Sequence, residues 1–185
     1  QRTEKTVCEA MDTYRFDLAS QALYDFVWAE YCSWYLELSK PVLWDESASE
    51  AVKKGTRRTL IRVLETVLRL AHPLMPYITE EIWQRVKELA GSQGETIMLQ
   101  PYPEPNEHKI DSEAEAAITW LKQVIEGVRN IRGEMNISPA KKIPLILRGG
   151  SVRDKELLEQ ARSLLVKLAS LESISWLEAG ESAPA

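Results

Sequence analysis

One predicted helix with an unusually wide apolar surface restricts the fold of this chain more than any other feature. Between residues 17 and 40, apolar residues recur at intervals of three and four, which places them on one helical face. The residues of this face are Leu23, Val27, Tyr31, Trp34 and Leu38. A neighbouring face carries Trp28, Cys32 and Tyr35. Because an ordinary surface helix has an apolar face only about 100° wide, this helix needs neighbours on several sides. The pattern predicts a helical bundle, with this helix ending at Pro41.

Capping signals mark the starts of two further helices. Ser47 and Glu50 form one S-x-x-E capping box, and Ser112 and Glu115 form a second. Each box is followed by a regular apolar face. A further helix comes after two closely spaced prolines, and we expect it to stop at Gly91, because glycine readily adopts the left-handed conformation of a helix C-cap.

The pattern changes after Pro139. A short apolar run at residues 143–147 reads as a strand, a leucine-rich helix follows, and a second strand is predicted at 174–177. These segments make a small βαβ-like module over residues 139–185, and the bundle occupies residues 1–138. The sequence therefore predicts a mainly α fold: an antiparallel helical bundle with a small C-terminal α/β module.

The overall composition is that of a globular protein from a reducing compartment. Hydrophobic residues make up 44% of the chain and charged residues 28%, and no apolar run approaches the roughly 18 residues that a membrane span needs. The two cysteines, Cys8 and Cys32, lack the spacing of a metal site. We therefore expect a soluble, cytoplasmic protein that does not contact a membrane.

No catalytic constellation can be assembled from these residues. The two histidines, His72 and His108, have no cysteine or serine nearby that is set as a nucleophile. The glycines do not form a phosphate loop, and the paired Glu-x-x-His motifs of a di-metal bundle are missing. We expect no catalytic residue, cofactor or metal ion in this chain.

The basic residues gather in two clusters although the formal net charge is −5. The segment from Lys53 to Arg69 holds six basic residues against one glutamate. Four of them recur on the face opposite the apolar residues of the same predicted helix: Lys54, Arg58, Arg62 and Arg69. The second cluster consists of Arg129, Arg132, Lys141 and Lys142.

Like charges one helical turn apart each cost a few tenths of a kcal/mol, and a polyanionic partner would offset that cost. A merely solvated surface is the alternative. If the clusters serve binding, we expect them to lie along one edge of the bundle. The negative net charge itself argues against a protein that coats nucleic acid indiscriminately.

Three stretches together resemble the C-terminal part of bacterial-type valyl-tRNA synthetases. They are FVWAEYCSWYLELSKP (26–41), HPLMPYITEEIW (72–83) and VRNIRGEMNISP (128–139). The second is shared, in looser form, among the synthetases for large aliphatic amino acids, whereas the first and third point to the valine enzymes. Ser33 departs from the family, which usually has aspartate there. The resemblance extends from Tyr14 to Leu177.

This resemblance implies a helical anticodon-binding domain that positions tRNA(Val) for aminoacylation. It also implies that the chain is a monomeric piece of a valine-tRNA ligase, whose catalytic domain uses ATP with Mg²⁺ and whose inserted domain edits mischarged tRNA. Neither domain's signatures occur in this sequence, so we expect no catalysis by the chain itself. We also expect the family's first bundle helix upstream of Gln1 and its coiled-coil arm after Ala185.

Candidate tRNA contacts follow from the charge clusters and the resemblance together. The residues expected to bind phosphates are Lys53, Lys54, Arg57, Arg58, Arg129, Arg132, Lys141 and Lys142. Base contacts are expected from Lys40, Trp44 and Asn136. The other aromatic residues between Phe26 and Pro41 are most simply core, because each buried ring contributes about 2 to 3 kcal/mol.

Two other functions stay open. The chain could be the equivalent domain of an isoleucyl- or leucyl-tRNA synthetase, or a helical scaffold that binds protein through its apolar faces. A scaffold should keep its affinity when arginines of both clusters are replaced by glutamine, whereas a tRNA-binding domain should lose most of its binding.

Overall fold

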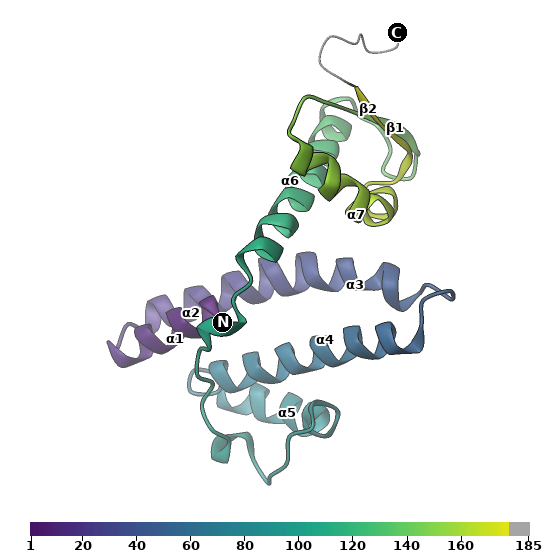
Figure 1. The fold of residues 1–185 in the computed structure, drawn as a ribbon. Coiled ribbons are helices and arrows are strands. Elements are labelled where there is room, and N and C mark those ends of the chain that lie inside the picture. The colour runs from purple at the N-terminus through teal and green to yellow at the C-terminus, as the bar shows by residue number, and fades with distance from the viewer. Residues whose placement is uncertain (178–185) are drawn as a thin grey trace. The chain divides into compact units, whose positions relative to one another are not determined.

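The computed structural model describes residues 1–177, which divide into two compact units, residues 1–110 and residues from 111 onward (Figure 1). Both units are rich in helix, and the second also contains a two-stranded sheet. These features confirm the predicted mainly α fold with a small C-terminal α/β module. Within residues 1–177, no helix is both long enough and apolar enough to cross a membrane.

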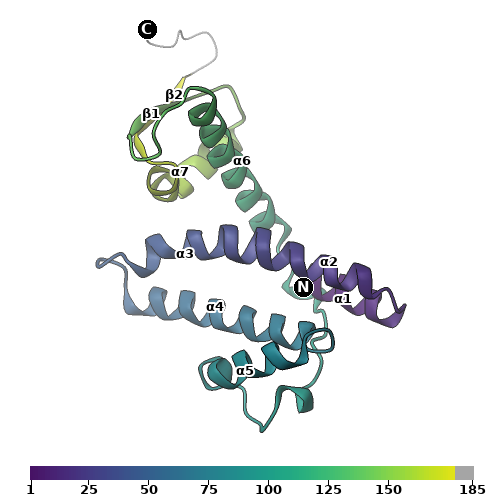
Figure 2. The ribbon, with the colours of Figure 1, turned by 180° about the vertical axis from the view of Figure 1, so that it is seen from behind.

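The first unit is built on a long helical hairpin (Figure 2). One arm joins α2 (Phe16–Asp25), a π-helix (Phe26–Tyr35) and α3 (Leu36–Leu43), and the other arm is α4 (Glu50–Ala71). Both α2 and α3 pack against α4. Because a short turn joins α3 to α4, the two arms are antiparallel, as the sequence predicts.

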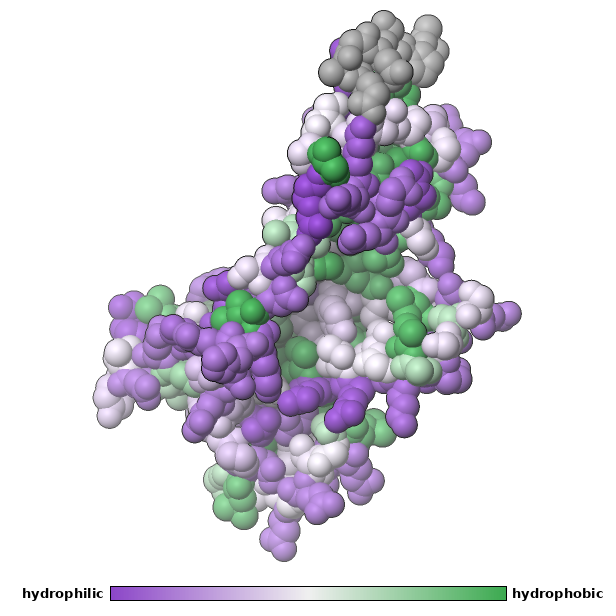
Figure 3. All heavy atoms as spheres, in the orientation of Figure 1, coloured by the Kyte–Doolittle hydropathy of each residue, from purple (hydrophilic) through white to green (hydrophobic). Residues whose placement is uncertain are grey.

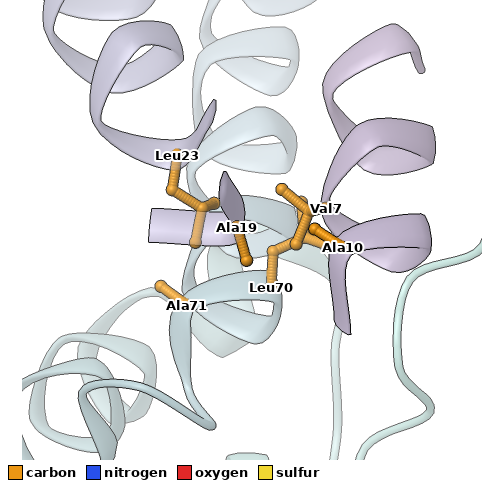
Figure 4. Packing of buried hydrophobic residues seen from close by; sticks show 6 residues of the cluster. All are labelled: Val7, Ala10, Ala19, Leu23, Leu70 and Ala71. Carbon is orange, nitrogen blue, oxygen red and sulfur yellow. The ribbon is translucent and has the colours of Figure 1, made fainter. Parts of the chain in front are cut away.

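Two further helices cover this hairpin. α1 (Arg2–Asp12) packs against α2, and α5 (Pro76–Ala90) packs against α4. Six buried residues from α1, α2 and the end of α4 form one apolar cluster, which Figure 4 shows: Val7, Ala10, Ala19, Leu23, Leu70 and Ala71. A second cluster joins α4 to α5 and to the segment that follows, through Leu68, Trp83 and Ile97.

After α5 the chain runs back along the first unit. We call this segment, residues 92–110, the strap. The strap contains two 3₁₀ turns, Ile97–Leu99 and Glu107–Lys109. The Tyr102 hydroxyl donates a hydrogen bond to the carbonyl of Leu70 at 3.0 Å, and Lys5 of α1 pairs with Glu107 at 2.8 Å. The strap is therefore tied to both α1 and α4.

The prediction that the aromatic side chains of residues 26–41 lie in the core is wrong in part. Residues 26–35 form a π-helix, and none of them is buried. A π-helix closes its hydrogen bonds from residue i to i+5, so residues spaced by three and four do not stay on one face. Trp28 is 64% exposed, and Tyr31, Trp34 and Tyr35 are only partly buried. The fully buried tryptophan is Trp83, on α5.

Helix ends differ from the prediction by a few residues. α3 continues through Pro41, so the helix does not end there as predicted. Ser49 rather than Ser47 caps α4, and its side chain accepts a hydrogen bond from a backbone N–H of the first turn. Asp111 caps α6 in the same way. The stop at Gly91 is confirmed, with φ of 80°.

The second unit combines one long helix with a βαβ module. Its elements are α6 (Ser112–Glu134), β1 (Ile143–Arg148), α7 (Val152–Leu168) and β2 (Leu171–Leu177). β1 and β2 pair in parallel with α7 between them, which confirms the predicted module. α6 packs against α7 and so belongs to the second unit, which begins at residue 111. The predicted domain boundary between residues 138 and 139 is a different division, and it stays a prediction.

Candidate nucleic-acid interface

A row of three basic side chains lies along one face of α4. Lys54, Arg58 and Arg62 follow one another at intervals of four residues, and all three are exposed. Within residues 1–177 none of these side chains has an ion-pair partner. We call these three residues the cation row. Successive members lie about 6 Å apart along the helix axis, so their charges add to one positive surface.

The other two basic candidates on α4 are partly compensated. Glu50, in the first turn, lies 4.0 Å from the Lys53 ammonium and 3.8 Å from the Arg57 guanidinium. The Lys53 side chain is only 13% exposed. Exposed pairs of this kind contribute about 0 to 1 kcal/mol, so a phosphate can displace Glu50 from Arg57 at little cost.

Lys40 and Trp44 lie together at the end of α3. Lys40 pairs with Glu37, and its ammonium lies 5.9 Å from the centroid of the Trp44 ring. That ring is 76% exposed. An exposed aromatic face beside a cation suits the stacking of an unpaired base, which is the role the sequence suggests for Trp44.

A polar groove of about 1310 Å³, its open mouth included, runs beside the cation row. Arg58, Arg62, Thr66 and Arg69 of α4 line one wall, and residues 101–104 of the strap line the other. The groove therefore adjoins the cation row, and its lining also includes the carboxylates of Glu4, Glu65 and Glu104. Arg58 and Arg62 belong to both, and Arg62 is not among the tRNA contacts predicted from the sequence.

The floor of the polar groove is held by a buried carboxylate. Glu65 is 4% exposed. Its Oε1 accepts hydrogen bonds from Trp83 Nε1 at 3.0 Å and from Ser92 Oγ at 3.1 Å, and its Oε2 accepts from Arg69 Nε at 3.1 Å and Nη2 at 3.0 Å. Arg69 Nη1 in turn donates to the carbonyl of Pro101 at 2.7 Å. Arg69 is thus a fixed, neutralised part of the wall and not a free member of the charged face.

A second carboxylate ties the strap to α5. Glu80 accepts hydrogen bonds from Gln84, from the Thr96 hydroxyl and from the backbone N–H of Ile97. These bonds, that of Gln84 above all, hold the pKa of Glu80 below its usual range. Burial raises the pKa of Tyr102 to about 12, so its hydroxyl keeps its proton and its bond to α4. The groove wall is preorganised by these contacts.

Arg132 is not available to a phosphate, which corrects the prediction. It is 7% exposed. Its Nη1 donates to the carbonyl of Ser138 at 2.9 Å. Its Nη2 lies within 3.2 Å of three further carbonyl oxygens, those of Lys141, Ala169 and Ser170. The guanidinium therefore joins the end of α6 to the βαβ module.

The sequence does carry a signal for this burial. Arg132 follows Leu121, Ile125 and Val128 at helical spacing, and all three are buried on α6. A residue that continues an apolar face points toward the same interior. Because Arg132 stands among other basic residues in the sequence, it was predicted to bind phosphate although its helical spacing indicates burial.

The remaining candidates of the second unit are exposed. Arg129 lies on α6, Asn136 follows the end of that helix with φ of 51°, and Lys141 and Lys142 precede β1. The two basic clusters thus belong to different compact units. Their expected arrangement along one edge stays a prediction.

No group of three or more histidine, cysteine, aspartate or glutamate side chains in residues 1–177 is placed to hold a metal ion.

In the orientation of Figure 3 the surface is a mixture of hydrophilic and hydrophobic patches, with hydrophilic residues over much of the lower part of the view.

A comparison with protein families gives one match. The model of the family described as the anticodon-binding domain of tRNA ligase matches residues 1–147. The match includes the hairpin, the cation row, the polar groove and α6, and it ends within β1.

Proposed function

The chain belongs to the anticodon-binding domain family of tRNA ligases, and from this premise we propose that it is the tRNA-binding part of a valine-tRNA ligase. Its task is to position tRNA(Val) for aminoacylation by a catalytic domain of the same protein. The observation that carries the binding role is the uncompensated cation row in a chain of net charge −5. The motifs at 26–41 and 128–139 support valine over the other aliphatic amino acids.

The cation row is the proposed phosphate contact. Phosphate contacts fix the register of a nucleic acid on its protein, and base contacts add specificity. Lys54, Arg58 and Arg62 supply the first kind, together with Arg57 once it leaves Glu50. Trp44, with Lys40 beside it, is the candidate for the second kind in the first unit.

The exposed residues of the second unit extend this proposal. Arg129, Lys141 and Lys142 are candidate phosphate contacts, and Asn136 is a candidate base contact. Amino-acid activation with ATP and Mg²⁺ and the editing of mischarged tRNA belong to the other domains of the proposed ligase, which acts as a monomer in the cytoplasm. The residues of this chain bind and orient the tRNA.

Competition among tRNAs tests the proposal. Transcripts of the tRNAs for valine, isoleucine and leucine are competed for the 185-residue chain at low salt, and protection is mapped by hydroxyl radicals. We expect tRNA(Val) to bind most tightly, with protection in its anticodon arm. Preference for another tRNA would reassign the amino acid, and protection confined to the acceptor end would contradict the binding role.

A matched pair of variants tests the cation row itself. The variant K54Q/R58Q/R62Q removes three uncompensated charges, and R15Q/R85Q/R153Q removes three exposed charges that are paired with carboxylates. We expect the first variant to lose roughly tenfold to hundredfold in affinity and to reduce the slope of log affinity against log salt by about 2 to 3. The control variant should keep the affinity and the salt dependence of the unaltered chain. Equal losses of affinity in the two variants would show that binding depends on net charge and not on the cation row.

A further inference from the structure

A pocket of about 810 Å³, its open mouth included, lies between the end of α4, the start of α5 and the strap. We call it the histidine pocket. Most of its lining is apolar: Pro73, Pro76, Ile97, Met98 and Tyr102. The polar side chains of the lining are those of Arg69, His72 and Gln100. An apolar cavity with a few polar groups is the usual form of a binding site.

The hydrogen bonds of Thr79 fix the tautomer of His72. Thr79 is buried, and its hydroxyl oxygen lies 2.7 Å from the carbonyl oxygen of Met75 and 2.8 Å from Nδ1 of His72. A hydroxyl has one proton, and a hydroxyl and a carbonyl oxygen this close need that proton between them. The hydroxyl therefore donates to Met75 and accepts from His72, so the neutral imidazole carries its hydrogen on Nδ1.

The other ring nitrogen, Nε2, is left as a hydrogen-bond acceptor that faces the pocket. A neutral imidazole donates through only one of its nitrogens. Within residues 1–177 the Nε2 atom of His72 has no hydrogen-bond partner, and it is not closed to solvent. His72 lines the pocket, whereas Thr79, which holds the Nδ1 edge of the ring, does not. The opposite edge, with Nε2, is therefore the edge that reaches the pocket.

The charges around the pocket favour a neutral donor as the partner of Nε2. Arg69 lines the pocket, but its guanidinium donates to Glu65 and to the carbonyl of Pro101. Within residues 1–177 no carboxylate lines the pocket. A phosphate would therefore find no uncompensated cation, and an ammonium group would lose its water without gaining a carboxylate. A neutral N–H or O–H group suits this acceptor best.

Exposed apolar side chains lie beside the pocket. Met75 and Tyr77, on either side of Pro76, are both more than half exposed. On the strap, Met98 and Leu99 are equally open to solvent. Single exposed apolar residues are ordinary, but several around one pocket mark an interaction site, and methionine and aromatic residues are enriched in protein–protein interfaces. This rim therefore favours a protein as the partner.

The walls of the pocket are fixed before any partner arrives. Ile97 is buried against α4 and α5, and its backbone N–H donates to Glu80. The Tyr102 hydroxyl donates to the carbonyl of Leu70. A preorganised site loses little conformational entropy on binding, so one side chain that enters this pocket can contribute strongly to affinity.

We propose that the histidine pocket docks a partner protein through one tryptophan or tyrosine side chain of that partner. The aromatic ring lies between Pro73, Pro76 and Met98, and its N–H or O–H donates to Nε2 of His72. The apolar rim packs against the residues of the partner that flank this anchor. Aromatic anchors in central pockets carry much of the binding energy of protein interfaces. The inference is separate from the proposed tRNA contacts, which depend on the cation row.

Two small probes test the acceptor role of His72. The first is p-cresol, which has the ring and hydroxyl of tyrosine, and the second is 4-methylanisole, whose methylated oxygen cannot donate. Their binding to the 185-residue chain is followed by NMR at the amides of Ile97 and Met98. We expect p-cresol to bind roughly fivefold to tenfold more tightly, as for one neutral hydrogen bond, and nitrogen-15 spectra to show the hydrogen of His72 on Nδ1.

Three results would overturn the inference: equal affinities of the two probes, no binding of p-cresol up to its solubility, or a hydrogen on Nε2 in the free chain. These measurements use the unaltered chain, so they do not depend on the folding of any variant.

The two histidines of the chain provide a matched pair of variants. H72F keeps a ring at the pocket but removes the Nε2 acceptor, and H108F changes an exposed histidine of the strap. With H72F the two probes should bind with equal affinity, whereas H108F should keep the preference for p-cresol. Thermal melts establish that each variant is folded. A preference that survives in folded H72F would show that another group accepts the hydrogen bond and would overturn the role of His72.

Selected peptides test the docking role. Short random peptides displayed on phage are selected on the unaltered chain and, in parallel, on H72F. We expect the peptides that prefer the unaltered chain to share a tryptophan or tyrosine. Replacing that residue by benzothienylalanine or O-methyltyrosine, which lack the donor, should cost roughly fivefold to tenfold in affinity. If the selected peptides share no such residue, or bind H72F equally well, the docking role is wrong even where p-cresol binds.

Discussion

Arg58 and Arg132 occupy similar places in the sequence and opposite places in the structure. Each lies in a long amphipathic helix among other basic residues, and both were predicted to bind phosphates. Arg58 is exposed on α4 and lines the polar groove. Arg132 is 7% exposed, and its guanidinium is surrounded by four backbone carbonyls.

The difference shows how helical position decides the role of an arginine. Arg58 belongs to a face opposite the apolar residues of α4, whereas Arg132 continues the apolar face of α6. A buried guanidinium is stable only where its donors are satisfied. The carbonyls of Ser138 and Lys141, and those at the turn between α7 and β2, accept from its Nη1 and Nη2, whereas its buried Nε has no hydrogen-bond partner within residues 1–177. Arg132 therefore stabilises the second unit and leaves binding to exposed residues.

Replacing Arg132 should have the largest effect on stability. R132Q removes the donors to the carbonyls of Ser138, Lys141, Ala169 and Ser170, and we expect the free energy of unfolding of the second unit to fall by about 3 kcal/mol or more. R148Q, at an exposed position at the end of β1, is the control variant. It should change the free energy of unfolding by less than about 0.5 kcal/mol. Urea unfolding combined with amide hydrogen exchange measures both. Similar values for the two variants would contradict the structural role of Arg132.

The same comparison can be made between carboxylates of the first unit. Glu65 is buried and accepts four hydrogen bonds, whereas Glu81 forms an exposed pair with Arg85. We expect E65Q to lower the free energy of unfolding by about 2 kcal/mol, since it leaves the Arg69 charge without its partner, and E81Q by at most about 0.5 kcal/mol. Midpoints of urea unfolding distinguish them. A small effect of E65Q would mean that the groove floor is held by other contacts.

A smaller effect is expected from acid, through Glu80. Because the pKa of Glu80 in the folded chain is lowered from 4.5, its ionised form stabilises the fold. That contribution is fully present above pH 4.5 and is lost as the pH falls through the lower, folded value. The protection of the Ile97 amide, whose N–H donates to Glu80, should therefore fall at acid pH when its exchange rate is compared with that of an unfolded chain at the same pH. In E80Q the same amide should show no such step.

The smallest stability change is expected for the cation row. In K54Q/R58Q/R62Q two repulsions between charges one turn apart disappear, so the free energy of unfolding should rise by a few tenths of a kcal/mol. This sharpens the comparison with Arg132, because three exposed charges then matter less for folding than one buried charge. A loss of more than about 1 kcal/mol would indicate that the row also packs against its own unit.

Most of the secondary structure could be predicted from local patterns. Capping residues, the glycine stop at Gly91 and the apolar run before Arg148 depend on neighbours within a few residues, and the helices and strands they predict are present. The π-helix could not be predicted in this way. Residues Phe26–Tyr35 adopt it, and Trp28, which lies within it, is 64% exposed.

The candidate site was predictable only as a set of charges. The sequence identifies the basic segment of α4, and the spacing of Glu65 and Arg69 on a helix favours their ion pair, but it does not show that Glu65 also accepts from Trp83 and Ser92. It gives no sign that Glu4, Arg62 and Glu104 meet at the polar groove, since these residues are far apart along the chain. Such contacts depend on the packing of α1, α4 and the strap against one another.

By itself the sequence determined the helical bundle, the βαβ module and the segments in which positive charge gathers, because helix faces, caps and strand runs are properties of nearby residues. The tertiary structure decided which of those charges are exposed. Arg132 meets the carbonyl of Ser170, 38 residues away, and such a distant partner has no trace in the local pattern. Burial is a property of the folded chain, so the roles of its charged residues are assigned only when the helices pack.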